Sequence, residues 1–141
     1  MYDVFFSNIG VDAATKEALC TGLAAQGLTC YAADNSSLFA DADMNALAES
    51  RVCLLVLTDA LRAETCFAKA FPLCRQGFEL EAVGKIRLAV LAMSDYFRFA
   101  DGAPASGELA GAFFYIHTRG LAVMQTVDQA IAQCKALADA N

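Results

Sequence analysis

The sequence contains no tryptophan, only two prolines and a single histidine. With one histidine, and six cysteines that form no Cys-x-x-Cys pair, the chain lacks the ligand spacing of a zinc site, so we expect no bound metal. The cysteines mostly fall at apolar positions of the expected elements, which is typical of reduced, buried thiols rather than of a disulfide framework. They are Cys20, Cys30, Cys53, Cys66, Cys74 and Cys134.

Long apolar runs and basic clusters are also missing. The longest uninterrupted apolar stretches, 52–57 and 88–93, have six residues each, whereas a membrane-spanning helix needs roughly 20. The first residues have neither the basic nor the apolar region of a signal peptide, so we expect a cytoplasmic protein. The net charge is −6 and the lysines and arginines are scattered, which argues against nucleic acid as a partner.

What the chain does contain is a regular alternation of apolar strands and amphipathic helices. Its 141 residues, of which 57% are hydrophobic, suit one domain over 1–141 with a substantial core. Asp12 is a good N-cap and Gly27 a stop signal for the first helix, and Thr126 with Gln129 forms a capping-box pattern for the last. Strands are expected over 2–6, 28–32, 51–58, 86–92 and 113–117, and helices over 13–26, 42–49, from 59, and from 127.

The helix that begins at Asp59 contains a proline, Pro72, for which we expect a kink or a break near Phe71. We expect Gly77 to end this segment. Residues 94–108 contain Gly and Pro and are interpreted as a long surface loop.

This order of elements predicts an α/β fold of the flavodoxin-like type, a five-stranded parallel sheet of order 2-1-3-4-5 with helices on both faces. Ligands in such sheets bind beyond the carboxyl ends of the strands, at the point where the strand order reverses beside the first strand. We therefore expect Ser7, Asn8, the loop 34–41 and the start of the Asp59 helix to lie near one another.

Several spaced motifs resemble the Toll/interleukin receptor (TIR) domain, particularly of bacterial type. The first strand, YDVFFS over 2–7, is similar to the strand that opens the family. Ser50-Arg51 before the central strand and Leu57-Thr58 at its end also match, and the next helix carries ETCFAK over 64–69 where the family has a tryptophan–cysteine pair followed by a glutamate. The resemblance covers about 2–137.

The resemblance implies a module for signalling, as in innate immunity, that assembles through self-association or contacts with other TIR domains. Such contacts often use the loop after the second strand. Here that loop holds two apolar residues, Leu38 and Phe39, among polar ones. They are candidates for an interaction anchor, and packing of the loop onto the sheet edge is the alternative.

The resemblance also implies a link to NAD, because many members cleave its nicotinamide–ribose bond with a glutamate on the third helix. A carboxylate there stabilises the oxocarbenium-like ribose. Here Cys66 fits the family pattern, but Thr65 replaces the tryptophan and Lys69 stands at the glutamate position. A like charge about 4 Å away costs about 4 kcal/mol, or roughly three orders of magnitude in rate. The catalytic residue is therefore unassigned, and the sequence leaves open whether the chain is an enzyme.

Three other sources of a carboxylate remain. Glu64 lies about 140° around the helix from Lys69 and is a poor substitute. Glu79 and Glu81 follow the expected break at Pro72, so a loop there would bring them back toward the pocket. The third source is a partner subunit in an assembly.

Side chains expected near a bound nucleotide have structural alternatives. For Ser7 and Asn8 the alternative is turn chemistry, and for Lys69 it is a solvated helix lysine. His117, at the end of an expected strand, is interpreted as structural rather than as a general base, since no nucleophile can be paired with it. The nucleotide-binding candidates are Phe6, Ser7, Asn8, Asp34, Cys66 and Lys69.

Two functions are consistent with these residues. The first is a TIR signalling or interaction module with a degenerate NAD site, which requires no cofactor. The alternative is an NAD hydrolase or cyclase, for which assembly is one route to activity and NAD is the substrate.

Overall fold

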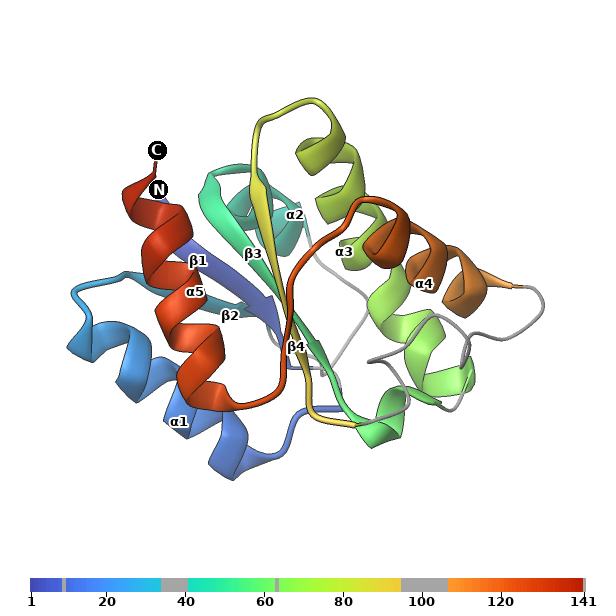
Figure 1. Cartoon of the computed structure of the whole chain (residues 1–141), viewed down its shortest axis with the longest axis horizontal. Coiled ribbons are helices and arrows are strands. Elements are labelled where there is room, and N and C mark those ends of the chain that lie inside the picture. Colours follow the sequence, from blue (N-terminus) through green and yellow to red (C-terminus); the bar gives the residue numbers. More distant parts are fainter. Residues whose placement is uncertain (9, 34–40, 63, 95–106, 141) are drawn as a thin grey trace.

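The computed structural model describes residues 1–8, 10–33, 41–62, 64–94 and 107–140, and for residues 41, 64–70 and 108 it describes the backbone only. Strands and helices alternate along the chain (Figure 1). The elements are β1 (Tyr2–Ser7), α1 (Ala13–Ala25), β2 (Cys30–Ala33), α2 (Asp41–Ala48), β3 (Ser50–Leu57), the 3₁₀ turn η1 (Asp59–Arg62), α3 (Glu64–Ala82), β4 (Arg87–Ala92), α4 (Glu108–Thr118), β5 (Val123–Met124) and α5 (Val127–Asp139).

The strands form one five-stranded parallel sheet of order β2-β1-β3-β4-β5. β3 is the central strand, and its residues pair in register with β1 on one side and β4 on the other. This confirms the predicted flavodoxin-like fold. The predicted loop over 94–108 lies largely outside the described residues.

Neighbouring residues of each strand point to opposite faces of the sheet. Apolar residues lie on both faces, and a layer of helices covers each one. Val52, Leu54 and Val56 pack on the face covered by α1 and α5, whereas Cys53 and Leu55 pack on the face covered by α2, α3 and α4 (Figure 1). Since β3 is buried on both faces, it is apolar at nearly every position, as the sequence predicted.

The predicted helix caps at both ends of the chain are confirmed. Asp12 Oδ1 accepts a 2.7 Å hydrogen bond from the Thr15 amide, and Thr126 Oγ1 accepts one of 3.2 Å from the Gln129 amide. The Gln129 side chain reaches back and accepts from the Gln125 amide at 2.9 Å. These bonds satisfy amide donors that have no partner within the helix itself.

Gly22 permits close packing of α1 against α5. A Cβ atom at this position would lie 2.1 Å from Ile131 Cδ1. The glycine inside α1 is therefore explained by an approach between two helices, and the cost of about 1 kcal/mol relative to alanine is offset by this packing.

The strand predicted over 113–117 is wrong, because these residues belong to α4. Leu109, Ala112, Phe113 and Ile116 are buried at helical spacing, whereas Phe114 is exposed. The aromatic run resembles a short strand, and periodicity over so few residues does not separate the two. The last strand is β5, farther along the chain.

Of the kink or break predicted near Phe71 because of Pro72, the break is wrong. α3 runs through this proline without interruption. Leu73, Cys74 and Phe78 bury one side of the helix against the sheet, and this packing outweighs the hydrogen bond that a proline removes. Gly77 does not end the helix. It lies inside α3, where a Cβ would be 3.4 Å from Cys53 Sγ, so it permits a close approach of helix and sheet.

Candidate functional site

The candidate site lies at the carboxyl edge of the sheet, where β1, β3 and β4 end. β1 lies between β2 and β3, so the strand order reverses at this position. This reversal is where doubly wound sheets bind ligands, since the loops that follow adjacent strands turn to opposite faces. Ser7 ends β1, and Thr58 directly follows β3.

Hydrogen bonds join the loops of this edge. Thr58 Oγ1 donates a 2.8 Å hydrogen bond to the Gly10 carbonyl, which ties the loop after β1 to the end of β3. Gly10 has a φ of 75°, and a Cβ there would lie 2.9 Å from Thr58 Oγ1. The loop therefore approaches β3 as closely as it does only because this residue is glycine.

The backbone of Asn8 is hydrogen-bonded, whereas its side-chain oxygen lacks a donor among the described residues. Its amide donates to the Ala33 carbonyl at 3.3 Å, and its own carbonyl accepts from the Val11 amide at 2.9 Å. Among the described residues, Asn8 Oδ1 is buried without a hydrogen-bond donor. A hydroxyl or amide donor brought to this edge would satisfy that oxygen.

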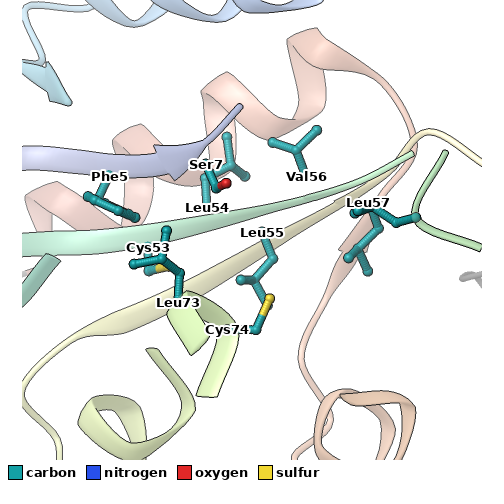
Figure 2. A pocket seen from close by; sticks show the side chains of 10 residues that line it. Phe5, Ser7, Cys53, Leu54, Leu55, Val56, Leu57, Leu73 and Cys74 are labelled. Atoms are coloured by element: carbon teal, nitrogen blue, oxygen red, sulfur yellow. The ribbon is translucent and has the colours of Figure 1, made fainter. Parts of the chain in front are cut away.

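Ser7 lines a small cavity beneath the edge, between the sheet and α3 (Figure 2). Its volume is about 20 Å³, and the other side chains that line it are apolar, including Leu55, Leu57 and Leu73. Such a space holds about one water molecule, whereas ligand pockets measure roughly 300–1,000 Å³. This cavity cannot hold a nucleotide.

Asp59 links the ends of β3 and β4, a role that we did not predict. Ser94 Oγ donates to Asp59 Oδ1 at 2.6 Å, and Arg62 Nη1 lies 3.7 Å from the same carboxylate oxygen. A signal was present in the sequence, since Asp59 and Ser94 each stand two residues after the end of a buried strand. Sequence spacing alone did not show that the two polar residues meet.

The candidate residues on α3 are separated by the length of the helix. Cys66 and Lys69 lie in its first turns, next to the carboxyl edge, and only their backbones are described. Glu79 and Glu81 lie in its last turns. At about 1.5 Å per residue, they are about 15 and 18 Å from Lys69 along the helix axis. The loop that would have returned these two carboxylates to the edge does not exist.

Both glutamates have partners where they are. Glu79 Oε1 accepts from Arg75 Nε at 3.2 Å on the exposed side of α3. Glu81 Oε1 accepts from Arg119 Nη2 at 2.7 Å, and the Tyr115 hydroxyl contacts Glu81 Oε2 and lies 3.0 Å from the Phe78 carbonyl. The Tyr115 ring stacks on Phe78 with centroids 4.3 Å apart.

The titration of this cluster follows from its contacts. Burial alone would raise the pKa of Glu81, but hydrogen bonds from Arg119 and Tyr115 and the Arg119 charge outweigh it, so the pKa of Glu81 lies below its ordinary value. Burial and the neighbouring Glu81 carboxylate raise the pKa of Tyr115 to about 12. At neutral pH the cluster therefore contains an ionised carboxylate and a neutral phenol.

The remaining predicted site residues divide into those inside and those outside the described chain. Phe6 is buried in the core on the α1/α5 face. His117 lies in α4 rather than at a strand end, its ring faces Phe113 at 6.0 Å, and within the described part of the chain its Nε2 is buried without a partner. Asp34, Leu38 and Phe39 lie outside the described residues.

In the described part of the chain no group of three histidine, cysteine, aspartate or glutamate side chains is placed to hold a metal ion. No helix within the same residues is long and apolar enough to cross a membrane.

The sheet order places this chain in the flavodoxin-like class of α/β folds. No protein-family model and no curated protein matches the sequence. Among solved structures, it is similar to the TIR domains of the activated Roq1 resistosome that directly recognises the pathogen effector XopQ, with a TM-score of 0.59 and 18% identity over 99% of this chain and 84% of that chain. It is also similar to diflavin flavoprotein A3 from Nostoc sp., with a TM-score of 0.51 and 10% identity over 97% of this chain and 87% of that chain. At these identities the likeness establishes a shared fold.

Proposed function

We propose that this protein is a TIR-type signalling module that acts through self-association or through contacts with other TIR domains. The observation that carries the proposal is the similarity of nearly the whole chain to the TIR domains of an assembled resistosome. The TIR-like motifs in the sequence support it independently. Two of them, the YDVFFS strand and the Ser50–Leu57 strand, are the adjacent strands β1 and β3 at the reversal point of the sheet.

The course of α3 supports a degenerate NAD site. The end of α3 near the carboxyl edge carries Lys69, and the two glutamates that would replace the family's carboxylate are at the other end. Glu81 is also held there by Arg119 and Tyr115. A lysine ammonium repels the positive charge that develops on the ribose when nicotinamide leaves.

The described surface adds one candidate contact for self-association. Phe114 on α4 is 72% exposed, and Gly111 and Thr118, which lie on the same side of the helix, are also exposed. An exposed aromatic ring beside small residues is the kind of anchor that interfaces bury. The Leu38 and Phe39 loop, outside the described residues, remains a predicted second contact.

Sedimentation velocity over a concentration series tests the self-association. We expect the weight-average mass to rise with concentration for the wild type and the rise to be reduced in Phe114→Asp or Phe39→Asp. Val83→Asp is the matched control, because Val83 is 67% exposed in the turn that follows α3 and the charge change is the same. A wild type that stays monomeric at all concentrations, alone and mixed with other TIR domains, contradicts the proposal.

One observation favours the alternative, an NAD hydrolase or cyclase. The buried Asn8 Oδ1 at the carboxyl edge has no donor among the described residues, and a ribose hydroxyl is a suitable one. Incubation of concentrated protein with NAD, followed by measurement of released nicotinamide, separates the two functions. We expect no release by the wild type and a gain in Lys69→Glu. Release by the wild type that disappears in Asn8→Ala would instead support the enzyme.

A further inference from the structure

Three cysteine side chains meet on the face of the sheet that α1 and α5 cover. Cys134, on α5, belongs to the buried cluster of this face, and Cys20, on α1, and Cys30, the first residue of β2, pack against the same cluster. The two helices lie side by side there (Figure 1). The three thiols come from three separate elements, so their spacing in the sequence does not show that they meet.

Two of these thiols are partly exposed to solvent and are in contact with each other. Cys20 and Cys30 are half-buried, whereas Cys53, Cys74 and Cys134 are buried. A hydrogen bond joins the side chains of Cys20 and Cys30. A disulfide requires two sulfurs that can approach to about 2 Å. Among the cysteines whose side chains are described, this pair therefore combines contact with access for a reagent in solution.

The electrostatics of the pair give its two members different roles. Burial, the charge of a Cys20 thiolate and the hydrogen bond between the two side chains raise the pKa of Cys30 to about 12. Cys30 therefore keeps its proton at neutral pH. The thiolate, and not the thiol, is the nucleophile in thiol–disulfide exchange. The first attack on a reagent is therefore expected from Cys20.

We propose that Cys20 and Cys30 are a reversible oxidation site that forms an intramolecular disulfide by exchange with a small disulfide compound. The bond would join α1 covalently to β2, the edge strand of the sheet. The proposal does not depend on the proposed function, because neither cysteine belongs to the carboxyl-edge site or to the exposed side of α4.

The exchange takes place in two steps. The Cys20 thiolate attacks one sulfur of the small disulfide, whose S–S bond breaks, and the other sulfur leaves as a thiolate. Cys30 then loses its proton to solvent and attacks the Cys20 sulfur, which releases the second half of the reagent as a thiolate. Both released thiolates take up protons. The protein pair is oxidised by two electrons, and the small disulfide is reduced to two thiols.

Oxidised glutathione is the probe. Reduced protein is incubated with it, then unfolded, alkylated and digested with trypsin. Cleavage after Lys16 and Arg51 gives a peptide, 17–51, that contains Cys20 and Cys30 and no other cysteine. In the wild type we expect this peptide to escape alkylation and to be lighter by two hydrogen atoms than its reduced form, while the three buried cysteines stay alkylated. Reduction with dithiothreitol before alkylation should restore both alkyl groups.

Single variants separate the two steps. Cys30→Ala should keep glutathione bound at Cys20, because the thiol that releases it is gone. In Cys20→Ala the glutathione adduct at Cys30 should form at least about tenfold more slowly, since Cys30 is protonated. Cys134→Ala is the matched control, and its 17–51 peptide should still lose two hydrogen atoms at the wild-type rate. Far-UV circular dichroism and thermal unfolding confirm that each reduced variant is folded.

Several results overturn the proposal. One is a 17–51 peptide that stays fully alkylated in the wild type, or that carries glutathione on both cysteines. Another is a disulfide that links 17–51 to 120–135, the tryptic peptide with Cys134. A disulfide-linked dimer on a non-reducing gel shows that the bond forms between molecules instead. Adducts that form equally fast on Cys20→Ala and Cys30→Ala overturn the order of attack.

Discussion

The two ends of the parallel sheet differ in what they hold. At the carboxyl end, hydrogen bonds such as Thr58 to Gly10 draw the loops together, and the space beneath them is about 20 Å³. At the amino end, Glu81, Tyr115 and Arg119 join α3 to α4 beside a hollow of about 350 Å³. The predicted site residues Ser7, Asn8 and Lys69 thus lie at one end, while the larger of these two spaces lies at the other. The site that the family resemblance predicts lies at one edge of the fold, and the resemblance gives no information about the rest of the surface.

The largest change in folding stability is expected at alkaline pH. It distinguishes the thiols beneath the carboxyl end from the phenol at the amino end. Burial raises the pKa of Cys74 from 9.0 to about 12, and burial also raises the pKa of Cys53 above its ordinary value. The folded state keeps these protons when the unfolded state has lost them. Stability is therefore complete below about pH 9 and lost as the pH rises toward 12, by about 3 kcal/mol per thiol at pH 11.

Urea unfolding at pH 7, 9, 10 and 11 measures this loss. Cys74→Ala should flatten the alkaline decline, and Tyr115→Phe should flatten it less, because the pKa of Tyr115 is raised from 10.0 to about 12, a smaller change. If the two variants flatten the decline equally, the ends do not differ in this respect.

The next largest loss of stability is expected from substitution of Gly10 at the carboxyl end. Gly10→Ala should destabilise the fold by about 2–3 kcal/mol, because alanine is strained at a φ of 75° and its Cβ would meet Thr58 Oγ1 at 2.9 Å. Gly27→Ala is the matched control, with a φ of 77° and no atom within 4 Å of the added Cβ. It should cost about 1 kcal/mol. Equal losses in thermal unfolding would mean that the loop contact contributes nothing.

Two glutamates of α3 should differ although they are two residues apart. Glu81→Gln should cost about 1–2 kcal/mol at pH 7, since its carboxylate is only 13% exposed and is bound by two donors. Glu79→Gln should cost about 0.3 kcal/mol, as for an exposed helix pair. Because the pKa of Glu81 is lowered in the folded state, its contribution is complete above its unfolded pKa and lost as the pH falls. Unfolding at pH 7 and pH 3 checks both statements, and an equal cost at the two pH values would contradict them.

A smaller loss of stability than for Glu81→Gln is expected when a hydroxyl is removed at the amino end. Tyr115→Phe keeps the ring stacked on Phe78 and removes the hydroxyl that contacts Glu81 and the Phe78 carbonyl. We expect a loss of about 1 kcal/mol in thermal unfolding. Tyr2→Phe, at a partly buried tyrosine whose ring packs at a tilt against Tyr31, is the control and should change stability by less. A larger loss in Tyr2→Phe would show that the amino-end cluster is not a principal hydrogen-bonded link.

The fold was predictable because its signals are local. Asp12 and Thr126 cap helices as expected, and the apolar run of β3 marks a strand covered on both faces. The errors occurred where packing overrides local preference. The aromatic residues of 113–117 are compatible with either a strand or a helix, and burial at four helical positions decides for α4. Pro72 has low helix propensity, but the buried side of α3 holds it in place.

The candidate site was only partly predictable. The end of β1 and the position of Ser7 and Asn8 follow from topology. The partners of Glu81 do not, because Tyr115 and Arg119 are more than thirty residues away along the chain. The hydrogen bond between Ser94 and Asp59 joins segments that follow two different strands, and a single sequence does not predict it either.

Pro72 gives α3 a built-in division between these two ends. A proline has no amide hydrogen, so the Ala68 carbonyl receives no helical hydrogen bond from position 72. The turns that carry Lys69 are therefore joined to the turns that carry Glu81 by one bond fewer than in an uninterrupted helix. In hydrogen-exchange terms, α3 should behave as two cooperative units: amides before Pro72 should exchange through a local opening, and those of Leu73 through Leu80 only when the core packing is lost.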